Sequence, residues 1–144
     1  MSGYLGSFRH TIDEKGRLSL PAQFRRDNPE QPLVLVNVFP HALTLYPEET
    51  WAQVEERLRD MMRRQPQARS FYLKVTANAV EVVPDKQGRI LVPRAMQDAV
   101  GIAGPTLIVG AIDRIELWDP QTFASQVEEA PVPDAENLTH QIFG

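Results

Sequence analysis

The sequence predicts an α+β fold, mostly β, in which one structural unit occurs twice. Three observations support this: a turn motif that recurs, short β-branched segments that come after each copy in the same order, and a long amphipathic segment between the copies. The chain of 144 residues has the length of one ordinary domain. A globule of this size can bury roughly two-thirds of its unfolded surface, which is enough for a hydrophobic core.

The internal repeat is clearest in the segment Asp13–Pro21, DEKGRLSLP, which recurs over Asp85–Pro93 as DKQGRILVP. At the same offset Leu45 corresponds to Leu117, so the similarity extends beyond the turn. We interpret it as a tandem duplication of a unit of about 50 residues rather than a solenoid, which needs more copies. The predicted organisation is unit one over 6–53, a helical linker over 54–76, unit two over 77–127 and a mobile tail over 128–144.

Each unit is expected to begin with a β-hairpin. A strand with partial apolar alternation leads into the Asp-x-x-Gly-Arg turn, and a second alternating segment returns from it. Gly16 and Gly88 in these turns suit a backbone position with a positive φ. The two hairpins therefore comprise Phe8–Ile12 with Leu18–Leu20, and Ala79–Val83 with Ile90–Val92.

A short helix and two more strands complete each unit. Proline comes after each returning strand, as it often does at a strand end or at a helix start. The helices are predicted over Ala22–Arg26 and over Arg94–Val100, and Gly101 ends the second one. Short β-branched segments then predict the strands Val34–Val38, Leu43–Tyr46, Leu107–Ala111 and Ile115–Trp118.

The two units differ in the segments that come after their last strands. Apolar residues recur at helical spacing within Glu48–Gln65, and Pro66 ends that predicted helix. A second helical segment over Ala68–Leu73 leads to unit two. Asp119 with proline directly after it predicts the start of a C-terminal helix. The tail beyond it contains two prolines and few large apolar residues, which is why we expect it to be mobile.

Composition excludes several classes of function. The chain has no cysteine, and its three histidines are not spaced as a helical metal site. It contains no glycine-rich phosphate loop, no paired-carboxylate site and no nucleophile motif. Its longest apolar runs, such as Leu33–Val36, are too short to cross a bilayer. We therefore predict no enzyme, no metal, no cofactor, no small-molecule substrate and no membrane partner.

Charge is distributed unevenly along the chain. The net charge of −4 does not itself suggest a nucleic-acid-binding protein. However, residues 1–74 hold 11 Lys and Arg against 9 Asp and Glu, whereas residues 75–144 hold 4 against 10. Local charge governs phosphate binding more than the total does, so the first half is the better candidate for contact with a polyanion.

The repeated turn has two interpretations that are compatible. In the structural one, Asp13 and Asp85 accept backbone N–H groups, the glycines allow the turn, and the arginine pairs with the aspartate. In the functional one, Lys15 and Arg17 project toward phosphates, because the planar guanidinium matches phosphate oxygens.

Further basic residues favour the functional interpretation. Arg25 and Arg26 lie about one helical turn beyond Pro21, and we expect them on the same side of the unit as the turn of that unit. Unit two keeps Lys86 and Arg89 in its turn but has no equivalent basic pair, since its corresponding positions hold Gln97 and Asp98. We therefore expect unit one to make most of the phosphate contacts.

These segments resemble the MraZ family of bacterial transcriptional regulators. Gly6–Leu18 and Pro21–Arg25 resemble the opening of its members, while Asp85–Ile90 and Glu116–Pro120 resemble their second half. The resemblance implies two SpoVT-AbrB-type units that form a pseudo-dimeric swapped-hairpin β-barrel with flanking helices. By it, Arg17 and Arg89 match the family's motif arginines, and Arg25 and Arg26 match basic positions of related AbrB-like units.

The resemblance also implies a function. Family members form rings and bind repeated sites in double-stranded DNA upstream of their own division and cell-wall gene cluster. The expected protein is thus a homo-oligomeric repressor or autoregulator in the cytoplasm, associated with the nucleoid. Two alternatives remain open: an oligomeric module whose turns bind an acidic protein, and an antitoxin-type regulator with a toxin-binding tail.

Overall fold

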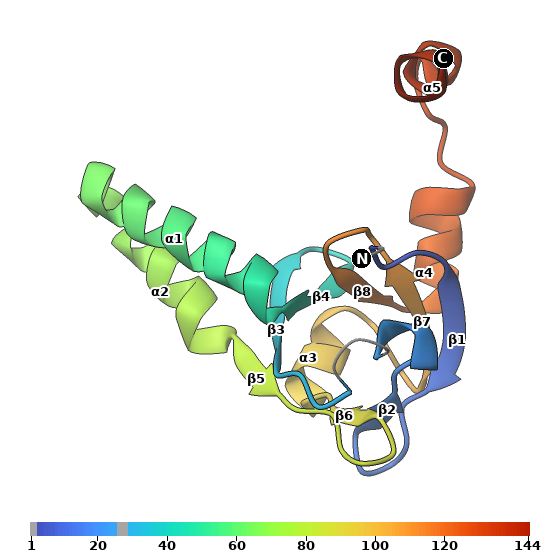
Figure 1. The fold of residues 1–144 in the computed structure, drawn as a ribbon, viewed down its shortest axis with the longest axis horizontal. Coiled ribbons are helices and arrows are strands. Elements are labelled where there is room, and N and C mark those ends of the chain that lie inside the picture. The colour runs from blue at the N-terminus through green and yellow to red at the C-terminus, as the bar shows by residue number, and fades with distance from the viewer. Residues whose placement is uncertain (1–2, 26–28) are drawn as a thin grey trace.

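The computed structural model describes residues 3–25 and 29–144 as two antiparallel β-sheets with attached helices (Figure 1). The strands are β1 Ser7–Thr11, β2 Arg17–Ser19, β3 Leu33–Phe39, β4 Ala42–Pro47, β5 Val80–Val82, β6 Arg89–Leu91, β7 Pro105–Gly110 and β8 Ile115–Trp118. The α-helices are α1 Glu48–Arg64, α2 Arg69–Asn78, α3 Arg94–Ala99, α4 Pro120–Phe123 and α5 Ala135–Phe143. The α+β prediction is confirmed.

Strand pairing interleaves the two units. The larger sheet has six strands in the order β1-β7-β8-β4-β3-β5, and β2 pairs with β6 in a second sheet. The first strand of each unit pairs with the third strand of the other, as β1 does with β7 and β5 with β3. The return strands β2 and β6 also pair across the units. Neither unit could therefore form these ladders alone.

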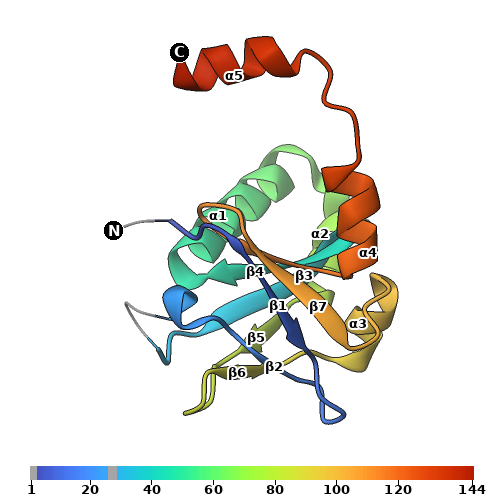
Figure 2. The same ribbon diagram turned by 90° about the vertical axis from the view of Figure 1, so that its right-hand side faces the viewer.

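The larger sheet has two free edges. Strands β1 and β5 end it, and within the described part of the chain no ladder joins them (Figure 2). The closed, swapped-hairpin barrel expected from the family resemblance is therefore not confirmed. Strands β2 and β6 form a separate two-stranded sheet. Each of them has only three residues, and in the described part of the chain each pairs with the other alone.

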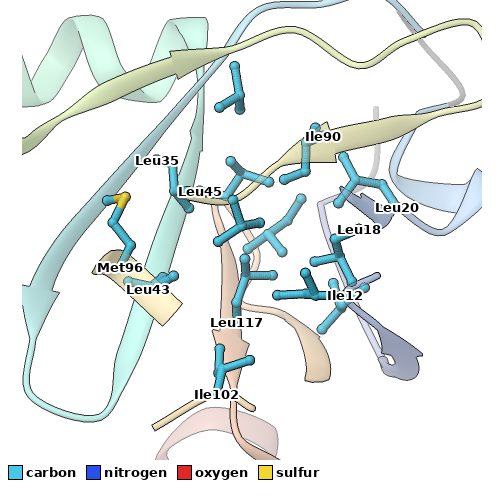
Figure 3. Close-up of a cluster of buried hydrophobic side chains, with 14 of the residues drawn as sticks. Ile12, Leu18, Leu20, Leu35, Leu43, Leu45, Ile90, Met96, Ile102 and Leu117 are labelled. Atoms are coloured by element: carbon cyan, nitrogen blue, oxygen red, sulfur yellow. The ribbon is translucent and has the colours of Figure 1, made fainter. Parts of the chain in front are cut away.

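The core lies between the six-stranded sheet and the β2–β6 ribbon, and both units contribute to it (Figure 3). Leu18 and Ile90 face each other in the β2–β6 register and are completely or almost completely buried. Leu43 and Leu117 pair in the same way between β4 and β8, and neither is exposed. Burial of each such side chain stabilises the fold by about 1.5–3 kcal/mol, which ties the two units together.

The predicted elements agree with the structure to within a few residues, with four differences. The strands of each predicted hairpin do not pair with each other, because β1 pairs with β7, β5 with β3, and β2 with β6. A 3-10 turn over Ala22–Phe24 replaces the predicted helix over Ala22–Arg26, and Arg26 lies outside the described residues. Helix α2 extends to Asn78, beyond the predicted end at Leu73. In the tail, Ala135–Phe143 forms helix α5, which was not predicted from the sequence.

Helices α1 and α2 project from the body as a hairpin (Figure 1). The base of α1 is held by Thr50, whose hydroxyl donates to the carbonyl of Asp113 at 2.9 Å, and by Trp51, whose ring lies 5.6 Å from that of Tyr46. At the other end, Asp119 caps α4 as predicted by accepting the N–H of Thr122 at 3.0 Å. No helix in the described ranges is long and apolar enough to span a bilayer.

Candidate nucleic-acid interface

The first turn is organised by the carboxylate of Asp13. Its Oδ1 accepts the backbone N–H groups of Lys15 and Arg17 at 3.0 and 2.9 Å, and its Oδ2 accepts Nε of Arg17 at 2.8 Å. The N–H of Gly16 donates to the Asp13 carbonyl at 2.9 Å, and Gly16 has a φ of +82°. A residue with a Cβ rarely adopts this conformation, so the sequence Asp-x-x-Gly-Arg builds the turn.

The second turn repeats these bonds. Oδ1 of Asp85 accepts the N–H groups of Gln87 and Arg89 at 2.9 Å each, and its Oδ2 accepts Nε of Arg89 at 2.9 Å. Gly88 has a φ of +78° and donates to the Asp85 carbonyl at 2.9 Å. The structural interpretation of the motif therefore holds in both units.

Hydrogen bonding shifts the titration of both aspartates. The backbone N–H of Arg17 is the largest influence that lowers the pKa of Asp13 below its usual 3.8, and the guanidinium of Arg17 adds to it. Arg89 lowers the pKa of Asp85 in the same way. Both carboxylates are therefore ionised at neutral pH, and each holds its arginine by a charge-assisted bond.

The turns are linked across the units. The carbonyl oxygen of Gly16 accepts the N–H of Val92 at 2.8 Å, and the carbonyl oxygen of Gly88 accepts the N–H of Leu20 at 2.9 Å. Each turn glycine thus holds the end of the other unit's return strand. This reciprocal bonding fixes the two turns relative to each other, and both lie at one end of the molecule in two views (Figure 1 and Figure 2).

The two motif arginines share one outward face. In the β2–β6 register Arg17 lies opposite Leu91 and Arg89 lies opposite Ser19, while the intervening Leu18 and Ile90 point into the core. Side chains alternate between faces along a strand, so the arginines emerge on the other side. They are 33% and 28% exposed, respectively, so a ligand could reach each guanidinium beyond its bond to aspartate.

Each turn also carries an exposed lysine. Lys15 and Lys86 are both exposed, and within residues 3–25 and 29–144 neither forms an ion pair. Lys15 and Arg17 thus lie in one turn and Lys86 and Arg89 in the other, and the antiparallel β2–β6 register sets these turns at opposite ends of the ribbon. The role of these four residues in DNA binding stays a prediction.

Arg25 is placed differently from the prediction. From the sequence it was expected beside the turn of its own unit, but its guanidinium lies against Gly88 in the turn of the other unit. Its Nε donates to the carbonyl of Leu20 at 3.1 Å, which holds the side chain in that direction. The reason is the interleaved pairing, which brings the end of β2 beside the second turn. Arg26 lies outside the described residues.

Gln97, the residue that replaces Arg25 in the second unit, has a role that was not predicted from the sequence. Its Nε2 donates to the carbonyl of Val92 at 2.9 Å, which matches the bond from Arg25 to Leu20. Gln97 is buried, being only 7% exposed. The sequence already aligned Gln97 with Arg25, but no local pattern shows that both side chains bond the carbonyl at the end of a return strand.

This face carries cations and hydrogen-bond donors, which can bind phosphate but supply neither an acid–base pair nor a nucleophile. In the part of the chain that the structure describes, no three His, Asp or Glu side chains gather as a metal site would require. The arrangement can therefore bind an anionic surface. The residues described at these turns form neither a catalytic nor a metal-binding group.

Comparison with known proteins gives consistent results. A family model described as "MraZ protein, putative antitoxin-like" matches twice, over residues 4–74 and 75–141, which agrees with the internal duplication. A protein of Thermomicrobium roseum is 38% identical over 125 residues, covering 87% of both chains. One of Desulfitobacterium hafniense is 36% identical over 140 residues, covering 95% of this chain and 97% of its own.

A third relative, from Corynebacterium glutamicum, is 36% identical over 126 residues, covering 88% of this chain and 87% of its own. All three relatives are named "Transcriptional regulator MraZ", which describes a regulator and not an enzyme. Both the family resemblance and the exclusion of an enzyme are thereby confirmed.

Proposed function

The chain belongs to the MraZ family of transcriptional regulators, and from that premise we propose that it binds double-stranded DNA through its two turn motifs. The observation that carries the proposal is the common outward face of Arg17 and Arg89, flanked by the exposed Lys15 and Lys86. Guanidinium and ammonium groups on one surface can bind backbone phosphates.

The rigidity of this face supports binding to a fixed geometry. Each arginine is held by its aspartate, and each turn is bonded to the opposite unit through its glycine carbonyl. Groups that are already ordered lose little conformational freedom on binding. Each aspartate offsets part of the positive charge of its arginine. The exposed lysines therefore supply attraction for phosphate that the paired arginines alone do not.

The finer features are also proposals. We propose a homo-oligomer, in ring form, that binds repeated sites upstream of its own division and cell-wall gene cluster as a repressor or autoregulator, in the cytoplasm and at the nucleoid. The cross-unit strand pairing is consistent with a pseudo-dimeric swapped-hairpin protomer. Repeated sites suit a protein with few cationic groups per protomer, because several linked weak contacts raise the overall affinity.

A second candidate function uses the same turns to bind an acidic protein. The exposed apolar residues of α5, among them Ile142 and Phe143, would suit the related antitoxin-type function, in which the tail captures a protein. The cations of the two turns would attract an acidic protein as well as DNA. A test on nucleic acid is therefore needed.

The deciding experiment measures binding of the full chain to a random-sequence duplex over a series of salt concentrations, and then a footprint on the DNA upstream of its own gene. DNA binding predicts a linear fall of log affinity with log salt, and protection of a repeated sequence upstream. If neither salt-dependent binding nor protection is found, the DNA-binding proposal is wrong and the protein-binding alternative gains support.

A further inference from the structure

The second turn receives a cation from the opposite unit. Arg25 belongs to unit one, yet its guanidinium covers Gly88, and Gly88 is buried although it lies in an otherwise exposed turn. A Cβ at residue 88 would overlap the guanidinium, so the close approach depends on glycine. Two hydrogen bonds fix the arrangement, from the Leu20 N–H to the Gly88 carbonyl and from Arg25 Nε to the Leu20 carbonyl.

The first turn has the same hydrogen bonds, but the neutral Gln97 stands where Arg25 contacts the second turn. The Val92 N–H donates to the Gly16 carbonyl, and Gln97 Nε2 donates to the Val92 carbonyl, as in the other half. However, Gln97 is neutral, shorter and buried. The two halves of the protomer are therefore alike in backbone but unequal in charge at this one pair of positions, Arg25 and Gln97.

The charge at each turn changes when Arg25 is counted with the turn that it contacts. Unit one has the more basic sequence, but the second turn then has the larger positive charge. The first turn, 13–17, holds two acidic and two basic residues, whereas the second, 85–89, holds one acidic and two basic residues. Arg25 adds to the second turn, and no carboxylate in the described ranges pairs with it. The second turn is thus the more cationic of the two.

The chemistry of the guanidinium suits a phosphate. Nε of Arg25 is occupied by the Leu20 carbonyl, and neither Nη group donates to any acceptor that the structure describes. A guanidinium oriented through Nε presents its outer donors in a fixed plane, which matches two oxygens of a phosphate. Lys86 and Arg89 lie on either side of Gly88 in the same turn, so their charges add at one place.

We propose that Arg25, Lys86 and Arg89 form a composite phosphate-binding site, assembled from both units, and that it binds a DNA backbone phosphate more strongly than the first turn does. The proposal rests on the proposed DNA-binding function and specifies how that function is divided within the protomer. It makes Arg25 a contact residue of the second turn, and it predicts that the protomer contacts DNA asymmetrically.

Substitutions at the two corresponding positions test this. Arg25→Gln copies the residue that the first half already uses, so the bond to the Leu20 carbonyl can persist while the charge is lost. Arg25→Lys restores the charge without the fork of Nη donors. Gln97→Arg places a guanidinium at the first turn. Arg94→Ala is the matched control, because Arg94 is 83% exposed and already paired with Asp98 at 3.1 Å.

The readout is the slope of log affinity against log salt for a random-sequence duplex, at matched melting temperature and oligomeric state. Arg25→Gln should lower the slope by about 0.9 per bound protomer, the value of one phosphate contact. Arg25→Lys should keep most of the slope, Gln97→Arg should raise it, and Arg94→Ala should leave it unchanged.

Each outcome has a distinct meaning. If wild-type protein binds with a salt-dependent affinity but Arg25→Gln keeps the wild-type slope, the composite site is wrong while DNA binding stands. If Arg94→Ala lowers the slope as much as Arg25→Gln does, the effect is one of general surface charge and the composite site is again wrong. If the wild-type protein shows no salt-dependent binding to the duplex, the proposed function itself fails.

Discussion

The backbone N–H of Val92 donates a hydrogen bond of 2.8 Å to the carbonyl oxygen of Gly16, which joins the end of one unit to the turn of the other. The reciprocal bond runs from Leu20 to Gly88 at 2.9 Å. These two bonds add to the cross-unit strand ladders and the shared core that join the two copies into one folded body. They also hold both Asp–Arg turns at fixed positions, which a phosphate-binding surface requires.

The first prediction concerns the turn glycines. Gly16→Ala should destabilise the protein more than Gly101→Ala does. Both residues have a positive φ, +82° and +72°, so both substitutions incur about 1–2 kcal/mol of backbone strain. Only at Gly16 would the new Cβ meet a backbone atom, the Val92 oxygen at 3.2 Å, whereas Gly101 has no atom within 4 Å. Denaturant unfolding of both variants measures the difference, and equal losses would contradict this account.

The second prediction separates the roles of the turn residues. Asp13→Ala should lower the melting temperature, because two backbone N–H groups and the Arg17 Nε lose their acceptor. Asp60→Ala is the control, since Asp60 forms surface ion pairs with Arg63 and Arg64 on α1, and within the described residues its carboxylate accepts no backbone N–H. Thermal melts at one protein concentration compare them. A larger loss from Asp60→Ala would show that the turn bonds contribute little.

The third prediction concerns acid. The pKa values of Asp13 and Asp85 are lowered by the N–H groups they accept, so the unfolded chain takes up protons first as the pH falls. At a pH above the ordinary aspartate pKa of 3.8, the two carboxylates contribute their full stabilisation. This stabilisation is lost as the pH falls through their lowered pKa values in the folded protein. Melting temperatures should therefore fall as the pH is lowered through this range.

The matched control for the acid experiment is the double variant Asp13→Asn with Asp85→Asn. Its melting temperature should depend less on pH. Part of the pH dependence should remain, because the pKa of Asp113 is also lowered in the folded protein. A double variant with the same pH dependence as the wild-type protein would mean that the turns do not cause the acid sensitivity.

Local signals in the sequence predicted most elements but not their partners. The turn at Asp13–Arg17 has chemistry that specifies a reversal by itself, so both copies were found. The pairing of β1 with β7, by contrast, joins segments far apart in the chain, and no local pattern encodes it. Helix α5 was missed because the prolines before it and its sparse apolar residues indicated a loop instead.

The candidate site shows the same division. The Asp–Arg bonds within each turn are local, and they were predicted correctly from the sequence. The position of Arg25 depends on which turn the end of β2 meets, and that is decided by the pairing of β2 with β6. The expectation that Arg25 lies beside the turn of its own unit, which came from its spacing beyond Pro21, was therefore wrong.

The fourth prediction is that binding is multivalent. One protomer offers only a few cationic contacts, so a single half-site should bind weakly at physiological salt. Duplexes with one, two and three half-sites, measured at one salt concentration, should bind with rising affinity. Spacing of about one helical turn should be best, because successive sites then face the same side of the duplex. Equal affinity for all three duplexes would exclude a multivalent complex.

Our central proposal is that Arg17 and Arg89 contact DNA and that each of their turns would still fold if its arginine were replaced. The most direct measurement is the affinity of the double variant Arg17→Ala with Arg89→Ala for the DNA upstream of its gene, alongside its melting temperature. Because surface ion pairs contribute only about 0–1 kcal/mol each, and because Asp13 and Asp85 still accept the backbone N–H groups, the fold should persist. We predict a nearly unchanged melting temperature with loss of the footprint and a reduced salt slope. A double variant that protects the same DNA with the wild-type affinity and salt slope would contradict the claim.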